Sequence, residues 1–204
     1  MLLKNYLQNF SSSVLQIIGP FFDESFDTES VLKDPVIYVD AGVHFRKIIQ
    51  GFAVGDGDSS RLPMDEKLKT KKNFSDLSYV LQNIPSHFSE IQVLGFLGHR
   101  KDHEIMNFAE IHEFLKKTTT NVQVNLDKKI KVLSKGTWDF VIHGSFSIFA
   151  WEEINLQLSG ACEYQVFPLQ PFSARSSQGL SNQGHGEIKI ICNNPVFLFL
   201  NADE

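Results

Sequence analysis

The pattern of the sequence changes near Thr120, and this change constrains the fold more than any other feature of the chain. Before Thr120, short apolar runs alternate with helical patterns, whereas after it short strand-like runs follow one another. Alternating strands and helices are typical of a mostly parallel sheet, and consecutive strands joined by turns are typical of antiparallel sheets. A chain of 204 residues is long enough for two small cores. We therefore expect two domains, residues 1–120 and 121–204.

The first domain is expected to be a three-layer α/β domain with a mostly parallel sheet. The expected strands are Val14–Ile18, Val36–Val39, Phe52–Val54 and Ile91–Phe96, and the expected helices are Leu77–Ile84 and Asp102–Lys117. Helices that connect parallel strands cover the two faces of the sheet. In such sheets ligands bind at the carboxyl ends of the strands.

The second domain is expected to be an antiparallel β-sandwich. Its expected strands are Val122–Leu126, Ile130–Leu133, Trp138–Ile142, Ser145–Trp151, Ile154–Leu158, Glu187–Cys192 and Val196–Leu200. Polar or glycine-bearing turns separate several of them, as consecutive antiparallel strands require. One long segment, Ser173–Gly186, is rich in Ser, Gly and Gln. We expect it to be a functional or mobile loop.

Composition and charge exclude several classes of function. The formal net charge of −5 argues against a nucleic-acid surface, which needs clustered Lys and Arg. The densest basic segment is Lys67–Lys72. No apolar run approaches the roughly 18 residues of a membrane helix, and the N-terminal segment lacks a small-residue cleavage site. We therefore expect a cytoplasmic protein. Cys162 and Cys192 have no metal-ligand spacing and are expected to be small buried hydrophobes.

Acidic residues follow the expected strands and helices at the edge where ligands bind. Asp40 ends the run Val36–Val39, and Asp56 and Asp58 follow Phe52–Val54. Asp76 begins one expected helix and Asp102 another. Carboxylates gathered at one edge repel one another unless a cation neutralises them. Because Mg²⁺ prefers a few carboxylates together with phosphate oxygens, a nucleotide–Mg²⁺ site is the natural resolution.

Other readings of these segments fit less well. A calcium loop starting at Asp56 would need Gly at its sixth position and Glu at its twelfth, where Arg61 and Lys67 stand. His99 and His103 have a spacing that occurs in zinc sites, but the segment lacks the internal Glu of a metalloprotease helix. The chain has no G-x-x-x-x-G-K-[ST] loop, no G-x-G-x-x-G fingerprint and no G-x-S-x-G elbow.

Five short motifs occur in order along the chain. They are Val39–Asp40–Ala41–Gly42; Gly55–Asp56–Gly57–Asp58–Ser59; Lys72–Asn73–Phe74–Ser75–Asp76; Gly95 through Gly98–His99–Arg100–Lys101–Asp102–His103 with Asn107; and Leu180–Ser181–Asn182. In this order they resemble the V-D-G-G, G-D-x-D-S, K-D-x-T-D, G-x-x-G-G-R-x-D-H and S-N motifs of the thiamine pyrophosphokinase family. The resemblance extends from about Val14 to Leu200 and includes the change from an α/β pattern to a β pattern.

The resemblance implies an ATP-binding catalytic domain, a β-sandwich domain for thiamine binding and dimerisation, and a homodimer with active sites shared between subunits. The implied reaction is in-line attack of the thiamine hydroxyl on the β-phosphorus of ATP, with Mg²⁺ as cofactor and AMP as product. Such transfer depends mainly on positioning and charge neutralisation.

The resemblance also implies roles for individual residues. The catalytic group would be Asp40, Asp56, Asp58, Asp76 and Asp102, of which Asp56, Asp58 and Asp76 would hold Mg²⁺. Lys72, Arg100, Asp102 and His103 would contact ATP. Ser181 and Asn182 would form hydrogen bonds with thiamine.

The sequence departs from the family pattern at five positions. Ala41 and His99 replace glycines, Gly57 stands where a larger residue is common, and Asn73 and Ser78 replace acidic residues. Two alternatives therefore stay open. The first alternative to a thiamine pyrophosphokinase is a pyrophosphokinase of the same fold that acts on another hydroxymethyl heterocycle, such as a pterin. The second is a catalytically silent binding protein for thiamine or a nucleotide. Five retained carboxylates favour an enzyme.

Overall fold

The computed structural model describes residues 1–22, 35–47, 50–98, 100–174 and 177–201. Within these residues, hydrogen bonding joins twelve strands into one mixed sheet, in the order β10-β9-β11-β8-β12-β7-β6-β5-β1-β2-β3-β4. The chain divides into two compact units. The first unit is Met1–Phe114 with Val124–Lys128, and the second is Leu115–Gln123 with Lys129–Glu204. The chain crosses between the units where the sequence pattern changes.

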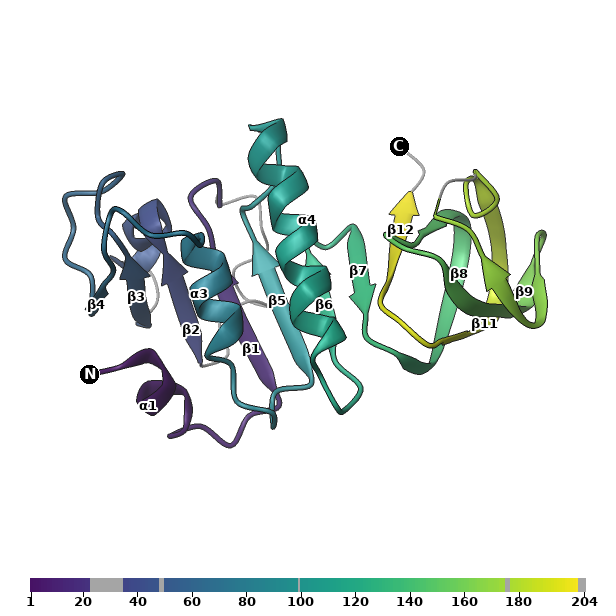
Figure 1. Cartoon of the computed structure of the whole chain (residues 1–204), viewed down its shortest axis with the longest axis horizontal. Coiled ribbons are helices and arrows are strands. Elements are labelled where there is room, and N and C mark those ends of the chain that lie inside the picture. The colour runs from purple at the N-terminus through teal and green to yellow at the C-terminus, as the bar shows by residue number, and fades with distance from the viewer. Residues whose placement is uncertain (23–34, 48–49, 99, 175–176, 202–204) are drawn as a thin grey trace. The chain divides into compact units, whose positions relative to one another are not determined.

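The first unit contains most of the helices. Its elements are α1 (Leu3–Leu7), β1 (Val14–Ile18), β2 (Val36–Val39), the 3-10 helix η1 (Asp40–Lys47), β3 (Phe52–Gly55), β4 (Glu66–Lys67), α3 (Asp76–Gln82), β5 (Glu90–Leu94), most of α4 (Lys101–Lys116) and most of β6 (Gln123–Leu126). Figure 1 shows α3 and α4 on one face of these strands. The predicted strands and helices of this region therefore exist, and their ends differ from the predicted ones by at most two residues.

The central strands of the first unit are parallel. Strand β1 pairs with β2 on one side and with β5 on the other, and β3 pairs with β2 and β4. All four residues of β2 and of β3 are buried, as expected for parallel strands covered on both faces. Because the strands run in one direction, the residues that follow β2 and β3 lie at the same edge of the sheet.

The second unit is built from antiparallel strands. Its strands are β7 (Ile130–Leu133), β8 (Gly136–Phe149), β9 (Ile154–Cys162), β10 (Val166–Phe172), β11 (Asn182–Cys192) and β12 (Val196–Asn201). Every ladder recorded within this set is antiparallel. Buried side chains from all six strands gather in one hydrophobic core. The three-layer and sandwich arrangements stay predictions.

The predicted division of the second half of the chain into strands and a loop is wrong in detail. The two strands expected at Trp138–Ile142 and Ser145–Trp151 form the single strand β8, because Gly144 pairs with Gly184 and the ladder to β11 continues past it. The loop expected at Ser173–Gly186 is shorter, because β11 already begins at Asn182.

Strand β10 was not expected from the sequence. Its two prolines, Pro168 and Pro171, weaken the strand pattern, since a proline cannot donate a ladder hydrogen bond. The strand lies at the end of the sheet order, the position where prolines are tolerated.

Both cysteines are free. Cys192 is buried, as predicted, and burial raises the pKa of its thiol to about 11, whereas Cys162 is only half-buried. Among the described residues, no helix has the length and apolar character that a membrane span requires.

Candidate active site

Two parallel strands deliver two aspartates to one edge of the sheet. Asp40 directly follows β2 and Asp56 directly follows β3, and the register pairs Val39 with Val54. Asp40 starts the 3-10 helix η1 with φ at 51°, a left-handed conformation that is uncommon outside glycine but tolerated by Asp. The strand ends therefore bring the two carboxylates close together, as the sequence predicted.

The start of α3 delivers the third aspartate. Ser75 caps the helix by accepting a hydrogen bond of 2.9 Å from the Ser78 N–H, and Asp76 is the first helical residue. The Ser75 hydroxyl also donates a hydrogen bond of 2.6 Å to Glu110 of α4. The cap thus determines where the Asp76 carboxylate lies.

These three residues, Asp40, Asp56 and Asp76, form an acidic cluster. Each offers a carboxylate oxygen, and these oxygens all lie within 4.8 Å of one another. Asp56 is buried and the other two are half-buried. Oδ1 of Asp40 is inaccessible to solvent, and no residue that the structure describes donates a hydrogen bond to it. A buried oxygen without a donor, beside two further carboxylates, suits a hard cation such as Mg²⁺.

Lys72 lies against the acidic cluster. Its Nζ atom is 2.8 Å from Oδ2 of Asp56 and 3.1 Å from Oδ1 of Asp76. The Lys72 side chain is only 9% exposed. Three carboxylates and one ammonium leave the cluster with an excess of negative charge when all four groups are ionised.

The pKa values within the cluster move in different directions. Burial raises the pKa of Asp40, and it also raises that of Asp76. The hydrogen bond from Lys72 lowers the pKa of Asp56. Burial opposes the charge of Lys72, but its hydrogen bonds to Asp56 and Asp76 outweigh burial and raise the pKa of the ammonium. Burial thus disfavours the ionised forms of Asp40 and Asp76, and repulsion from the neighbouring aspartates adds a smaller effect in the same direction.

Asp58 does not belong to this group of three oxygens. Its side chain is exposed and accepts a hydrogen bond from the Ser59 hydroxyl, while its N–H donates to Oδ1 of Asp56. Gly57 has φ at 75°, which a larger residue would adopt only with strain. The sequence predicted that Asp56, Asp58 and Asp76 hold the metal ion. In the structure the carboxylate that clusters with Asp56 and Asp76 is that of Asp40 and not that of Asp58. A metal role for Asp58 stays a prediction.

A groove of about 500 Å³ adjoins the cluster. It is lined by Asp56, Gly57, Asp58, Lys67, Leu68, Lys69, Thr70 and Lys71. The lysines at 67, 69 and 71 were not assigned a role from the sequence, although the basic segment Lys67–Lys72 was visible there. Lysines beside a carboxylate cluster suit a polyphosphate whose remaining charge a metal ion neutralises.

The loop between β5 and α4 is held by side chains from elsewhere in the first unit. Asp127 accepts hydrogen bonds from the N–H groups of Gly95, at 2.6 Å, and Leu97, at 3.0 Å. Asn107 donates to the carbonyl of Phe96 at 3.0 Å. Sequence reasoning missed Asp127 and read Asp127–Lys129 only as a turn, because nothing local shows that its carboxylate reaches a distant loop.

Arg100, Asp102 and His103 follow this loop at the start of α4, and all three are exposed. The guanidinium of Arg100 forms an ion pair with Asp102, which raises the pKa of Arg100 and lowers that of Asp102. The structure does not include Asp102 among the clustered oxygens. The predicted roles of these residues toward ATP are untested, and His99 lies outside the described residues.

Ser181 and Asn182 lie in the second unit, at the beginning of β11. Asn182 is buried, and its amide forms two hydrogen bonds with the backbone of Tyr164, one to the carbonyl at 2.6 Å and one from the N–H at 3.0 Å. Ser181 is exposed, has φ at 56°, and donates its N–H to the Ser147 hydroxyl. Asn182 therefore has a structural role besides the predicted contact with thiamine.

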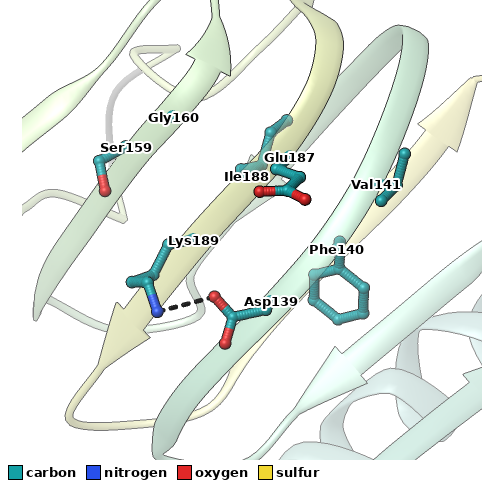
Figure 2. A pocket seen from close by; sticks show the side chains of 8 residues that line it. All are labelled: Asp139, Phe140, Val141, Ser159, Gly160, Glu187, Ile188 and Lys189. Carbon is teal, nitrogen blue, oxygen red and sulfur yellow. Dashed lines mark ion pairs between the residues drawn. The ribbon is translucent and has the colours of Figure 1, made fainter.

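A second hollow, of about 470 Å³, lies on the sheet of the second unit (Figure 2). Its lining comes from β8, β9 and β11: Asp139, Phe140, Val141, Ser159, Gly160, Glu187, Ile188 and Lys189. Figure 2 shows Lys189 directed toward Asp139, with which it forms an ion pair of 2.8 Å. None of these residues belongs to a motif identified in the sequence.

Comparison with known proteins identifies the fold. No protein-family model matches the chain, and no curated protein matches it. Among solved structures, the chain is similar to thiamine pyrophosphokinase from Bacillus subtilis, with a TM-score of 0.72, 20% identity and coverage of 94% of this chain and 100% of that one. The chain has the thiamine pyrophosphokinase fold.

Two further thiamine pyrophosphokinases support the same conclusion. The enzyme from Geobacillus thermodenitrificans matches with a TM-score of 0.67 and 18% identity over 94% of this chain and 98% of that chain. The enzyme from Candida albicans matches with a TM-score of 0.69 and 12% identity over 91% and 88%. The resemblance stated from the motifs is thus confirmed at the level of the fold.

Proposed function

We propose that this chain is a Mg²⁺-dependent thiamine pyrophosphokinase that transfers pyrophosphate from ATP to the hydroxyl of thiamine. The observation that carries the proposal is the acidic cluster of Asp40, Asp56 and Asp76, whose oxygens lie within 4.8 Å of one another. The cluster adjoins a groove lined by lysines. The motif order and the shared fold supply the choice of reaction.

Asp40, Asp56 and Asp76 would hold Mg²⁺, with Asp58 beside them. When bound, Mg²⁺ neutralises phosphate oxygens and stabilises the charge that develops on them. The lysines of the groove and Lys72 would bind the polyphosphate and align it for in-line attack. Arg100 and His103 would contact ATP, and Asp102 would help to orient the nucleophile.

The transfer forms a bond between the hydroxyl oxygen of thiamine and the β-phosphorus. The bond from that phosphorus to the oxygen bridging the α-phosphorus breaks, and AMP leaves with this oxygen. The hydroxyl proton is lost to water. Ser181 and Asn182 would bind thiamine, and a homodimer would contain two such sites, each shared between subunits. This arrangement is supported by the resemblance.

The test is AMP release from ATP with a panel of heterocyclic alcohols. AMP is expected only when ATP, Mg²⁺ and thiamine are all present, and omission of Mg²⁺ should abolish it. A thiamine analogue without the hydroxyl is the matched control and should yield no AMP. A signal with a hydroxymethyl pterin but not with thiamine would transfer the proposal to the same chemistry on another acceptor. No AMP with any acceptor would contradict it.

A further inference from the structure

Lys72 bridges two of the three clustered carboxylates. Its Nζ atom lies 2.8 Å from Asp56 and 3.1 Å from Asp76, and its side chain is 9% exposed, compared with 9% for Asp56 and 14% for Asp76. These are the contacts that a bound cation would make with the same oxygens. A divalent ion that bridged Asp56 and Asp76 would lie in direct contact with the Lys72 ammonium. The repulsion between two adjacent cations opposes binding of the metal ion.

The neighbouring groove offers the ammonium another partner. Lys71 and Asp56 both line it, so a phosphate group bound there would lie close to the residue next to Lys72 and to one of its two partners. A lysine side chain has a flexible stem of four carbons, which allows its ammonium to exchange one anion for another.

We propose that the Lys72 ammonium occupies the cation position between Asp56 and Asp76 in the free protein, and that a divalent cation binds there only when a phosphate group draws the ammonium away. Lys72 is then a positioning residue that makes metal binding depend on the nucleotide. This inference rests on the metal site of the proposed function. It adds that the metal ion does not bind first and alone, but binds together with the polyphosphate.

Metal binding without nucleotide distinguishes this role from a purely structural ion pair. We would measure Mn²⁺ affinity by electron paramagnetic resonance, with no nucleotide present, for the wild type, Lys72→Met and Lys71→Met. Lys72→Met should bind Mn²⁺ more tightly by at least about tenfold, the factor that corresponds to one pKa unit of interaction. Lys71→Met removes the same charge one residue away and should change the affinity by less than about twofold.

A conservative variant and a stability measurement keep the test decisive if Lys72→Met folds poorly. Lys72→Arg keeps a cation beside the carboxylates and should bind Mn²⁺ as weakly as the wild type. The melting temperature of Lys72→Met should fall without metal and recover on addition of Mn²⁺, whereas that of the wild type should not respond to Mn²⁺ alone. A purely structural ion pair would lower the melting temperature of Lys72→Met without any gain in Mn²⁺ affinity, and that result would overturn the inference.

A second arm separates failure of this inference from failure of the proposed function. The wild type is titrated with Mn²⁺ and a non-hydrolysable ATP analogue that carries an α,β-methylene bridge, and protein-bound Mn²⁺ is measured. If Mn²⁺ binds the wild type equally well with and without the analogue, only the role of Lys72 is wrong. If Mn²⁺ binds neither the wild type with the analogue nor Lys72→Met alone, there is no metal site and the proposed function fails with it.

Discussion

The acidic cluster and the Arg100–His103 segment were both predicted from sequence motifs, but they differ in burial and in how their charged groups are paired. Asp40, Asp56 and Asp76 converge and are at least half-buried, with Lys72 between two of them. Arg100, Asp102 and His103 are exposed, and the two of opposite charge pair with each other. The fold holds the carboxylates of the cluster close together at a cost in repulsion, whereas the exposed segment can change partners at little cost. Mutations should therefore affect stability in the first region and only ligand binding in the second.

The largest expected effect is the loss of turnover on replacing Asp56. Asp56→Asn should lower AMP release by about a thousandfold or more, because it removes a charge from the metal site. It should also destabilise the free protein, since the Asp56 pKa is lowered by Lys72 and its ionised form is therefore favoured in the folded state. Turnover and the melting temperature are the measurements. An Asp56→Asn variant with normal turnover would show that the cluster is only structural.

Replacing Asp127 should have the next largest effect. Asp127→Ala removes the acceptor for the N–H groups of Gly95 and Leu97, and each unsatisfied buried donor costs about 1–3 kcal/mol. Chemical denaturation and amide hydrogen exchange in the loop 95–98 would measure this loss. Asp139→Ala is a control of the same chemistry on an exposed ion pair of the second unit. If the two variants were equally stable, the loop that precedes Arg100 would not depend on Asp127.

Asp40→Asn should stabilise the free protein while it impairs activity. The neutral side chain removes repulsion from a carboxylate whose pKa is raised by burial, and we expect a rise in melting temperature of roughly 2–4 °C, the change that about 1 kcal/mol produces in a protein of this size. Saturating Mg²⁺ and ATP should reverse the order of stability, because the wild type gains binding energy that the variant lacks. A fall in the melting temperature without ligand would contradict this interpretation of Asp40.

The difference in stability between Asp40→Asn and the wild type should also depend on pH, in a direction that the pKa of Asp40 determines. The Asp40 carboxyl has a pKa that is raised in the folded state above its ordinary value of 3.8. Such a group contributes stability at pH values below its ordinary pKa, and this contribution is lost as the pH rises through the folded-state pKa. The difference in melting temperature between Asp40→Asn and the wild type should therefore be small near pH 4 and should grow toward pH 7. A difference that shrinks with rising pH would mean that Asp40 is stabilised as a carboxylate.

The smallest expected effect is that of Arg100→Gln on stability. Because Arg100 and Asp102 form an exposed ion pair, the melting temperature should stay within about 1 °C of the wild type. The Michaelis constant for ATP should rise if Arg100 contacts the phosphates, as proposed. A large loss of stability would show that the Arg100–His103 segment contributes to the stability of the fold. The proposed difference between this segment and the acidic cluster would then be wrong.

Local pattern predicted most of the backbone. Strands β1, β2 and β7 have the predicted ends, because their apolar runs are bounded by polar residues or turns. Strand β10 was missed because its prolines are typical of a loop. Strand β8 was predicted as two strands because Gly144 is typical of a turn, although it pairs with the neighbouring strand. In both cases the neighbouring strand, which local pattern does not reveal, decided the structure.

The sequence by itself determined which residue types stand at the ends of the parallel strands, and hence that Asp40 and Asp56 meet at one edge. Only the tertiary structure decided that Asp40 and not Asp58 completes the group with Asp76, and that Lys72 lies between carboxylates. It also brought the Asp127 carboxylate, which follows β6, within hydrogen-bond distance of the loop after β5. The physical reason is that periodicity reports backbone conformation and burial over a few residues. The distance between side chains far apart in the chain depends instead on register and on the course of the loops.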